Sequence, residues 1–304
     1  MTGVRRSILS APMLDPAGLD LESARRITYR IEQRFRYTYE SPVSVLSQRL
    51  VIVPRPRHGD LYRRAHLLEI SGARAEHRTR QDACGNTVVR VTAARVEREV
   101  EFRVVAVLER VRGDRLPLPA AALRDAALHA PTSLTAPDDR LRQLAADLVR
   151  AGGEPADVAE RICSAVHATM SYGFGTTSVV TTAAQALAGG IGVCQDYAHI
   201  MISLCRLAGL PARYVSGHLL GQGGTHAWVE VIVAQDGVAT ALALDPCHGR
   251  RAHSGYVTVA VGRDYTDVAP TSGTYVGAPS GRLTGDRSVG VIAVDNPLGE
   301  GGAR

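Results

Sequence analysis

The sequence predicts an α+β fold in which a β-rich N-terminal part precedes a helical segment and a second antiparallel sheet. Three observations lead to this prediction. Apolar and polar residues alternate along several short stretches before residue 112, as in half-buried strands. Two stretches after residue 137 repeat their apolar residues at helical spacing. From residue 212 the alternation returns, and Asp236-Gly237 supplies a hairpin signal between two of the strands.

The β-rich part is expected to be an antiparallel sandwich over residues 26–112. Ile27, Tyr29 and Ile31 alternate with polar residues in its first strand, and Ser41-Pro42 breaks that strand. Gly85 is expected at positive φ in a tight turn. The further extended stretches of this part are expected at 43–54, 65–70, 88–91 and 96–111.

Helices and strands follow one another in the second part. We expect residues 1–25 to be a mobile leader, 113–137 a linker, 138–295 the core domain and 296–304 a flexible tail. Expected helices cover 138–151, 155–167 and 183–188, and an apolar helix over 200–207 ends at Gly209-Leu210-Pro211. Expected strands cover 212–220, 225–234, 238–245, 256–261 and 289–294.

Composition limits the classes of function. The 304 residues carry a net charge of +5, and every one of their basic side chains is an arginine. Arginines can form a nucleic-acid surface, but interspersed carboxylates and an aromatic content of 5% favour a solvated sheet face. We find no apolar run of bilayer length and no signal-peptide pattern. Five scattered cysteines predict no disulfide framework. The sequence therefore predicts a cytoplasmic protein that binds neither nucleic acid nor membrane.

Cys194 lies in the stretch Gly-Val-Cys-Gln-Asp-Tyr-Ala-His, at the start of the apolar helix. The unpaired N–H groups and the positive dipole end of a helix N-terminus favour a thiolate over a thiol. Glycines before Cys194 would leave its side chain accessible. Taken alone, the stretch is equally compatible with a small buried cysteine.

His226 and Asp245 give this cysteine two potential partners. His226 begins one strand of the expected hairpin, and Asp245 ends the other. Closure at Asp236-Gly237 brings these two ends together, and neighbouring strands lie about 4.8 Å apart, so the carboxylate can reach the imidazole. A nucleophile, a base and a residue that orients the base are the components of thiol catalysis. The backbone N–H of Cys194 can face a developing oxyanion.

Three more residues are candidates for contacts with substrate or oxyanion. Trp228 shares a strand face with His226 and either walls the site or packs in the core. Tyr172 is a possible second oxyanion donor or a structural residue, and Gln195 follows the nucleophile directly.

No metal and no cofactor are expected. The paired short spacings that are typical of zinc ligands do not occur, and Cys194 and Cys205 are about 16 Å apart along one helix. Cys247-His248 with His253 matches a metal site only weakly.

Four motifs, GVCQDYAH, LAGLPARYVSGHL, THAWVEV and LDP, resemble the transglutaminase-like superfamily in order and spacing. YESPVSVLSQRL and DACGN resemble the N-terminal domain of its bacterial branch, so the resemblance covers residues 26–277. It implies a papain-like or transglutaminase-like core with Cys194 as nucleophile, His226 as general base and Asp245 as orienter. Many relatives continue with Thr-Asn where this chain has Cys247-His248.

The resemblance implies acyl chemistry on a peptide or protein amide through a thioester, as in a cysteine protease, an amidase or a transglutaminase. The superfamily also contains inactive members, so a non-catalytic peptide-binding module on the same fold is the alternative. Without an evident cluster of calcium-binding carboxylates, we expect no calcium dependence. The sequence leaves open hydrolysis versus transfer, the acyl donor and acceptor, and the oligomeric state.

Overall fold

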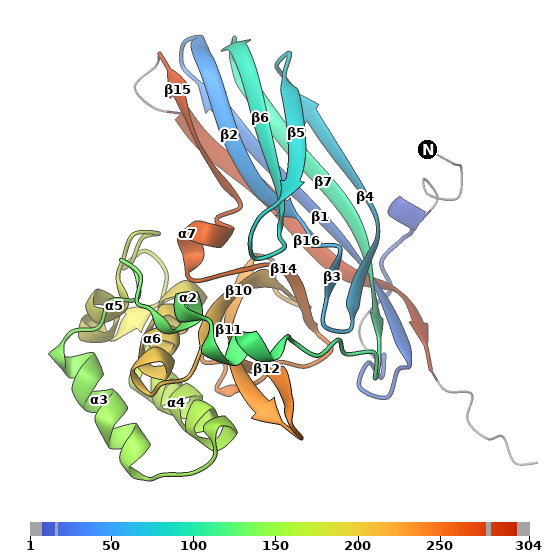
Figure 1. The fold of residues 1–304 in the computed structure, drawn as a ribbon. Coiled ribbons are helices and arrows are strands. Elements are labelled where there is room, and N and C mark those ends of the chain that lie inside the picture. The colour runs from blue at the N-terminus through green and yellow to red at the C-terminus, as the bar shows by residue number, and fades with distance from the viewer. Residues whose placement is uncertain (1–7, 16–17, 278–280, 297–304) are drawn as a thin grey trace, which may run out of the picture.

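A β-sandwich stands beside a helix-covered sheet in the computed structural model, which describes residues 8–15, 18–277 and 281–296 (Figure 1). The strands of the sandwich are β1 (Arg26–Tyr39), β2 (Val43–Val53), β3 (Arg57–His58), β4 (Leu61–Ser71), β5 (Glu76–Gln81), β6 (Thr87–Val96), β7 (Glu99–Val111), β15 (Thr271–Val276) and β16 (Gly281–Asp295). One sheet has the order β16-β1-β7-β4-β3, and the other has the order β15-β2-β6-β5.

Alternating side chains fill the space between these two sheets. Phe35 and Phe102 of one sheet share a buried cluster with Leu50 and Val89 of the other. This burial of every second residue is what the period-two pattern predicts for a sandwich. Gly85 has a φ of 77°, as expected for the turn before β6.

The second part has helices on an antiparallel sheet, which confirms the predicted α+β class. Its strands are β10 (Ala212–Leu219), β11 (His226–Gln235), β12 (Val238–Asp245), β13 (Arg250–Arg251) and β14 (Tyr256–Gly262), in the order β13-β12-β11-β10-β14. β8 (Ser171–Tyr172) and β9 (Ile191–Gly192) form a small parallel pair. The helices are η1 (Ala120–Arg124), α2 (Ala126–His129), α3 (Asp139–Arg150), α4 (Pro155–Thr169), α5 (Ala183–Gly189), α6 (Cys194–Leu207) and α7 (Tyr265–Val268).

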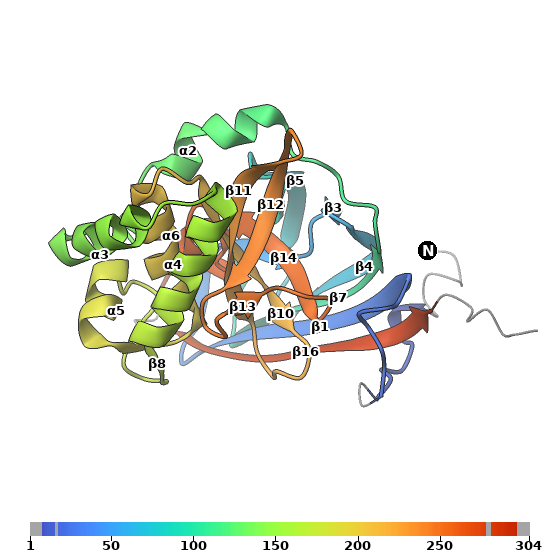
Figure 2. The same cartoon turned by 90° about the horizontal axis from the view of Figure 1, so that it is seen from below.

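Helix α6 is the centre of this part. It packs on β10 and β11, and α3, α4 and α5 surround it (Figure 2). Residues 195–206 of α6 are all buried. The hydrophobic core is continuous with the sandwich, because Tyr29 and Leu108 belong to the same buried cluster as Met201 and Val229. None of the helices in the described ranges is long and apolar enough to cross a membrane.

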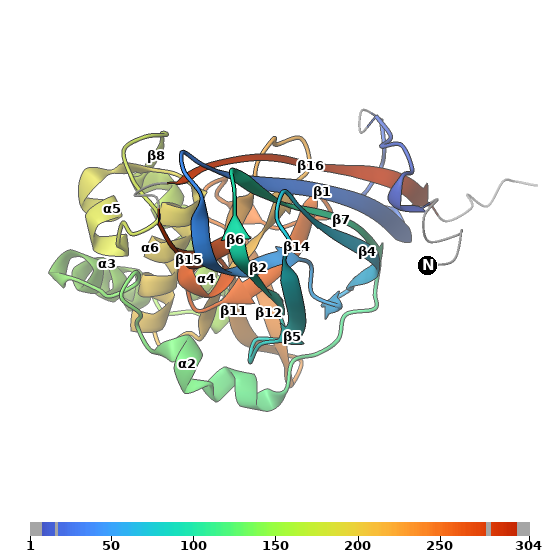
Figure 3. The same cartoon turned by 90° about the horizontal axis from the view of Figure 1, so that it is seen from above.

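The C-terminal strands belong to the sandwich, so the expected core domain of residues 138–295 extends too far. β16 pairs with β1 along its length, from Arg26↔Asp295 to Tyr39↔Gly281, and β15 pairs with β2 (Figure 3). Strand β1 buries alternate side chains and needs a partner on each edge, which β7 and β16 provide. The sequence predicted only residues 289–294 of this long strand.

The segment before β1, for which the sequence predicts a mobile leader, packs against the sandwich in the described residues 8–15 and 18–25. Leu9 is buried with Val105 and Val107, and the Leu14 N–H donates to the Val291 carbonyl over 2.7 Å. The apolar side chains of Ile8 and Leu9 are packed because they cover apolar residues on one face of the sheet. The leader residues 1–7 and 16–17, and residues 297–304 of the expected tail, lie outside the described residues. The expected linker contains η1 and α2.

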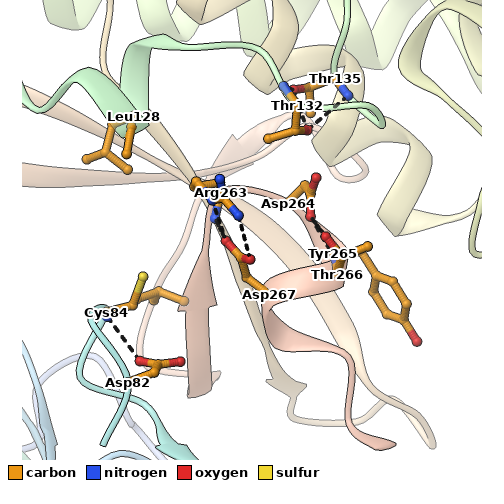
Figure 4. Close-up of polar contacts among 12 residues, drawn as sticks. Asp82, Cys84, Leu128, Thr132, Thr135, Arg263, Asp264, Tyr265, Thr266 and Asp267 are labelled. Carbon is orange, nitrogen blue, oxygen red and sulfur yellow. Dashed lines mark hydrogen bonds and ion pairs between the residues drawn. The ribbon is translucent and has the colours of Figure 1, made fainter. Parts of the chain in front are cut away.

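Arg206, in the last turn of α6, ties the helix to three other segments. Its guanidinium donates to the Leu128 carbonyl over 3.0 Å and to Thr135 Oγ1 over 2.8 Å. It also donates to the carbonyls of Ala212 (3.1 Å) and Arg263 (2.7 Å). Figure 4 shows the surroundings, where Arg263 is itself paired with Asp267, Asp264 with Thr266, and Thr132 with Thr135. Burial lowers the pKa of Arg206 to about 10, so the side chain stays charged at neutral pH.

Glu230 on β11 joins the sandwich to the helix-covered sheet. Its carboxylate is buried, and His58 Nε2 of β3 lies 2.6 Å from Oε1. Arg213 Nε of β10 donates to Oε2 over 2.7 Å. Burial opposes ionisation of Glu230, but His58 and Arg213 outweigh burial and hold its pKa well below the usual range. The charge of this carboxylate therefore contributes to stability above the pKa of an unfolded glutamate, about 4.3.

Glu230→Gln is expected to reduce the free energy of unfolding at pH 7 by about 2–3 kcal/mol, because Arg213 loses its counter-charge in a buried site. The charge of native Glu230 stabilises the fold less as pH falls below about 4.3. The difference in free energy of unfolding between the two proteins should therefore narrow by about 1 kcal/mol at pH 3.5. Urea unfolding followed by Trp228 fluorescence measures both values. Glu97→Gln, which removes an exposed carboxylate paired with Arg95, is the control. If the two proteins have the same free energy of unfolding at pH 7, or if the difference widens at pH 3.5, the charge of Glu230 does not stabilise the fold.

Candidate active site

Cys194 is the first residue of α6, with Val193 as N-cap. Asp196 holds this helix start, because its Oδ2 accepts from the Val193 N–H over 2.8 Å and from Thr177 Oγ1 over 2.7 Å. A side chain at position 192 would clash, since a Cβ on Gly192 would lie 2.6 Å from Asp196 Oδ2. Cys194 thus lies at a helix start, as the sequence predicted. Its side chain is half-buried.

The hairpin of β11 and β12 brings His226 to Asp245, as its turn predicted. Asp236 and Gly237 have φ values of 52° and 77°, and Gln235 pairs with Val238 across the two-residue turn. His226 Nε2 lies 2.7 Å from Asp245 Oδ2, and both side chains are buried. The second ring nitrogen of His226, Nδ1, is left for Cys194, which lies close enough to raise the pKa of His226.

These contacts shift the pKa values of His226 and Asp245 in the directions that favour an ion pair between the two side chains. Burial alone would lower the pKa of His226, but its hydrogen bonds with Asp245 and Cys194 outweigh burial and raise the pKa to about 9. Burial alone would raise the pKa of Asp245, but its hydrogen bonds, first of all with His226, lower it to about 2. At neutral pH the arrangement therefore favours a protonated imidazole between a carboxylate and a sulfur.

Asp245 has two further side-chain partners that the sequence analysis missed. The Tyr256 hydroxyl of β14 donates to Oδ2 over 2.6 Å, and His248 Nδ1 lies 2.7 Å from the same oxygen. Oδ1 accepts from the backbone N–H groups of Cys247 (2.9 Å) and His248 (3.3 Å). The sequence signals for His248 were its departure from the Thr-Asn of relatives and a weak match to a metal site, and Tyr256 gave none.

Trp228 lies against the histidine. Its ring stacks on that of His226, with the ring centroids 6.2 Å apart and an interplanar angle of 25°, and the residue is 1% exposed. Gly217 of β10 allows this packing, because a Cβ there would lie 2.3 Å from the Val257 carbonyl oxygen and 2.5 Å from the Trp228 ring. The ring thus belongs to a buried cluster and at the same time covers one face of His226.

Tyr172 and Gln195 lie near the nucleophile. Tyr172 is exposed and makes an edge contact with the ring of Phe174, with centroids 5.3 Å apart. Burial and then the neighbouring Cys194 and Cys247 raise the pKa of Tyr172. Gln195 is buried, and its Nε2 lies 3.4 Å from the Val179 carbonyl oxygen, so its side chain supports the loop between β8 and α5.

The other four cysteines are less suited to be nucleophiles. Burial raises the pKa of Cys163 and of Cys247 to about 12, and it also raises the pKa values of Cys84 and Cys205.

The donor set of His226, Asp245 and His248 is of a kind that metals bind, with ligand atoms within 4.8 Å of one another. In this structure each of those atoms already takes part in a hydrogen bond within the group. The arrangement is thus complete as a hydrogen-bonded network.

Two family models match the chain. The model of the transglutaminase-like superfamily matches residues 142–240, which include Cys194 and His226, and that of the bacterial transglutaminase-like N-terminal region matches residues 29–109. The chain combines a transglutaminase-like core with a bacterial transglutaminase-like N-terminal region. The family and the fold support the general class of cysteine-dependent hydrolases and acyltransferases.

Several known proteins resemble this transglutaminase-like chain. An uncharacterized protein of Mycobacterium tuberculosis is 29% identical over 275 residues, which cover 81% of this chain and 86% of the relative. One of Mycobacterium leprae is 39% identical over 118 residues, or 36% and 40% of the two chains. The crystal structure of a candidate cysteine protease from Cytophaga hutchinsonii superimposes with a TM-score of 0.72 at 20% identity and covers 90% of this chain and 93% of its own. This last likeness concerns the fold alone.

Proposed function

We propose that the chain is a cysteine-dependent enzyme that processes peptide or protein amides through a thioester, with Cys194, His226 and Asp245 as its catalytic triad. The observation that carries the proposal is the position of His226, which hydrogen-bonds to Asp245 through Nε2 and lies close enough to Cys194 for the thiol to raise its pKa. A nucleophile, a base and an orienter in this order are the components of thiol catalysis. The superfamily supports the same chemistry.

In the proposed reaction, the Cys194 proton passes to His226 and the thiolate attacks the amide carbonyl. The carbon–sulfur bond forms, and the carbonyl electron pair moves to oxygen. The backbone N–H of Cys194 has no partner within the helix at this position, so it can stabilise the oxyanion. His226 then gives its proton to the leaving amine as the carbon–nitrogen bond breaks. Water or a second amine attacks the thioester and releases Cys194.

The remaining candidates have supporting roles in this proposal. Trp228 excludes water from one face of the His226 imidazole, Tyr172 donates to the oxyanion from β8, and Gln195 fixes the loop beside the nucleophile. The sequence contains no lysine. A transferase reaction would therefore take its acceptor amine from another molecule, apart from the chain's own α-amino group.

The test of this proposal is the pH dependence of alkylation at each of the five cysteines, measured by mass spectrometry after short exposure to iodoacetamide. We expect Cys194 to react well below pH 8 and faster than the other four, because the imidazolium of His226 keeps its proton up to a pH of about 9. The other thiols should react only at higher pH, because burial raises their pKa values. A Cys194 that reacts no faster than a free thiol would favour the non-catalytic peptide-binding module.

A second experiment separates hydrolysis from transfer. An activated acyl ester loads Cys194, and the acyl-enzyme is then offered water with or without a primary amine. Free acid as the main product identifies a hydrolase, and amide as the main product identifies a transferase. Libraries of peptides, glutamine amides and isopeptides would then identify the acyl donor.

A further inference from the structure

The carboxylate of Asp245 accepts more hydrogen bonds than it can hold at full strength. Its Oδ2 has three donors, His226 Nε2 (2.7 Å), His248 Nδ1 (2.7 Å) and the Tyr256 hydroxyl (2.6 Å). Its Oδ1 has two backbone N–H donors. A carboxylate offers about four lone-pair sites, two on each oxygen. The three groups at Oδ2 therefore compete for the charge of one oxygen.

His248 is the competitor that comes from outside the buried core. It lies in the turn after β12, its side chain is 30% exposed, and its ring centroid is 5.2 Å from that of His226. Gln222, in the loop between β10 and β11, places its Nε2 3.1 Å from His248 Nε2. An amide nitrogen can only donate, so His248 Nε2 accepts from Gln222 and Nδ1 donates to Asp245.

We propose that His248 is a positioning residue that shares Asp245 with His226 and so sets how strongly the carboxylate holds the His226 imidazolium beside Cys194. This inference rests on the proposed function. His248 lies at the point where this chain has Cys247-His248 and many relatives continue with Thr-Asn.

The direction of the effect follows from what remains when His248 is removed. Tyr256 and the two backbone N–H groups still fix the orientation of Asp245. The carboxylate charge is then divided between fewer donors, so its bond to His226 strengthens and the imidazolium becomes more stable. A positive charge on His248 would have the opposite effect. A charged His248 would bond more strongly to Asp245 and would repel the nearby imidazolium of His226.

The groups that face this network come from every element packed around it. Tyr256 is itself an acceptor for Arg250 Nε over 3.1 Å, and His253 packs edge-on against the Tyr256 ring. The titratable or charged groups around Asp245 and His226 are Cys194 of α6, Cys163 of α4, Cys247 and His248 after β12, Arg250 of β13, His253 and Tyr256. All of them except His248 itself are retained when only His248 or Gln222 is changed.

The experiment measures the pKa of His226 by NMR of its imidazole nitrogens in a Cys194→Ser background. His248→Phe keeps a ring against His226 and removes the donor to Asp245, and it is expected to raise the pKa of His226 by about 0.5–1 unit. Gln222→Glu gives His248 Nε2 an acceptor and thus favours a charged ring. It is expected to lower the pKa of His226 by a similar amount. His248→Asn restores a neutral donor. The pKa of His226 in this variant should lie between its values in His248→Phe and in the protein with native His248.

Opposite shifts in the first two variants support the inference, since a merely structural role of His248 would move the pKa of His226 in the same direction in both. Unchanged pKa values, or shifts of one sign, overturn it. The same substitutions in the Cys194 protein should move the alkaline limb of the alkylation profile in parallel. An unreactive Cys194 in the unsubstituted chain would refute the proposed function and leave the NMR result standing. A reactive Cys194 whose profile ignores both variants would refute only the role of His248.

Discussion

His226→Ala is expected to slow the alkylation of Cys194 at pH 6 by about 30- to 300-fold. An ordinary cysteine with a pKa of 8.5 is only about 0.3% thiolate at pH 6, whereas a thiolate–imidazolium pair is largely ionised there. The lower figure allows for the weaker intrinsic nucleophilicity of a stabilised thiolate. The imidazolium is present at pH 6 because the pKa of His226 is about 9. Second-order rate constants with iodoacetamide, measured at Cys194 by mass spectrometry, give the ratio.

A matched control is His129→Ala, which removes a partly buried histidine of α2 whose ring nitrogen contacts the Leu123 carbonyl. This variant should alkylate at the rate of the unsubstituted protein, and Cys194→Ala should lose the fast-reacting site altogether. A rate ratio near one for His226→Ala would mean that the imidazole does not stabilise the thiolate. The catalytic roles proposed for Cys194 and His226 would then be wrong.

Arg206→Met should reduce the free energy of unfolding by about 3–5 kcal/mol. Methionine fills much of the volume of the arginine stem but leaves four acceptors without their donor, on Leu128, Thr135, Ala212 and Arg263. Leu128, Thr135 and Ala212 are buried, so water cannot freely replace the guanidinium at these three acceptors. The loss should be among the largest for any single substitution outside the apolar core, because one side chain joins four segments.

Urea unfolding followed by the fluorescence of Trp228 measures this loss. Arg150→Met is the control, because Arg150 is exposed on α3 and pairs with Asp147, one turn earlier in the same helix. Its removal should change stability by at most about 0.5 kcal/mol. If Arg206→Met were as mild as the control, the four hydrogen bonds would contribute nothing net to stability.

Local signals were enough for the elements that carry the candidate triad. Cys194 stands at a helix start because glycines precede an apolar run, and that pattern is read within a dozen residues. Asp236-Gly237 fixes the register of β11 with β12, because both residues adopt positive φ in a two-residue turn. The register in turn brings His226 to Asp245. Each step depends on neighbours in the chain, so the sequence by itself determined the α+β class and this contact.

The tertiary structure decided what lies around these elements. The pairing of β16 with β1 joins residues about 250 positions apart, and several other alternating strands could have competed for the same edge. For the same reason no pattern placed Tyr256 on Asp245 or His58 on Glu230. Such contacts form when distant segments are packed together, and periodicity carries information only about the face that a residue occupies. The sequence alone determined the three candidate catalytic residues, and only the packed chain showed that Asp245 is shared among five donors.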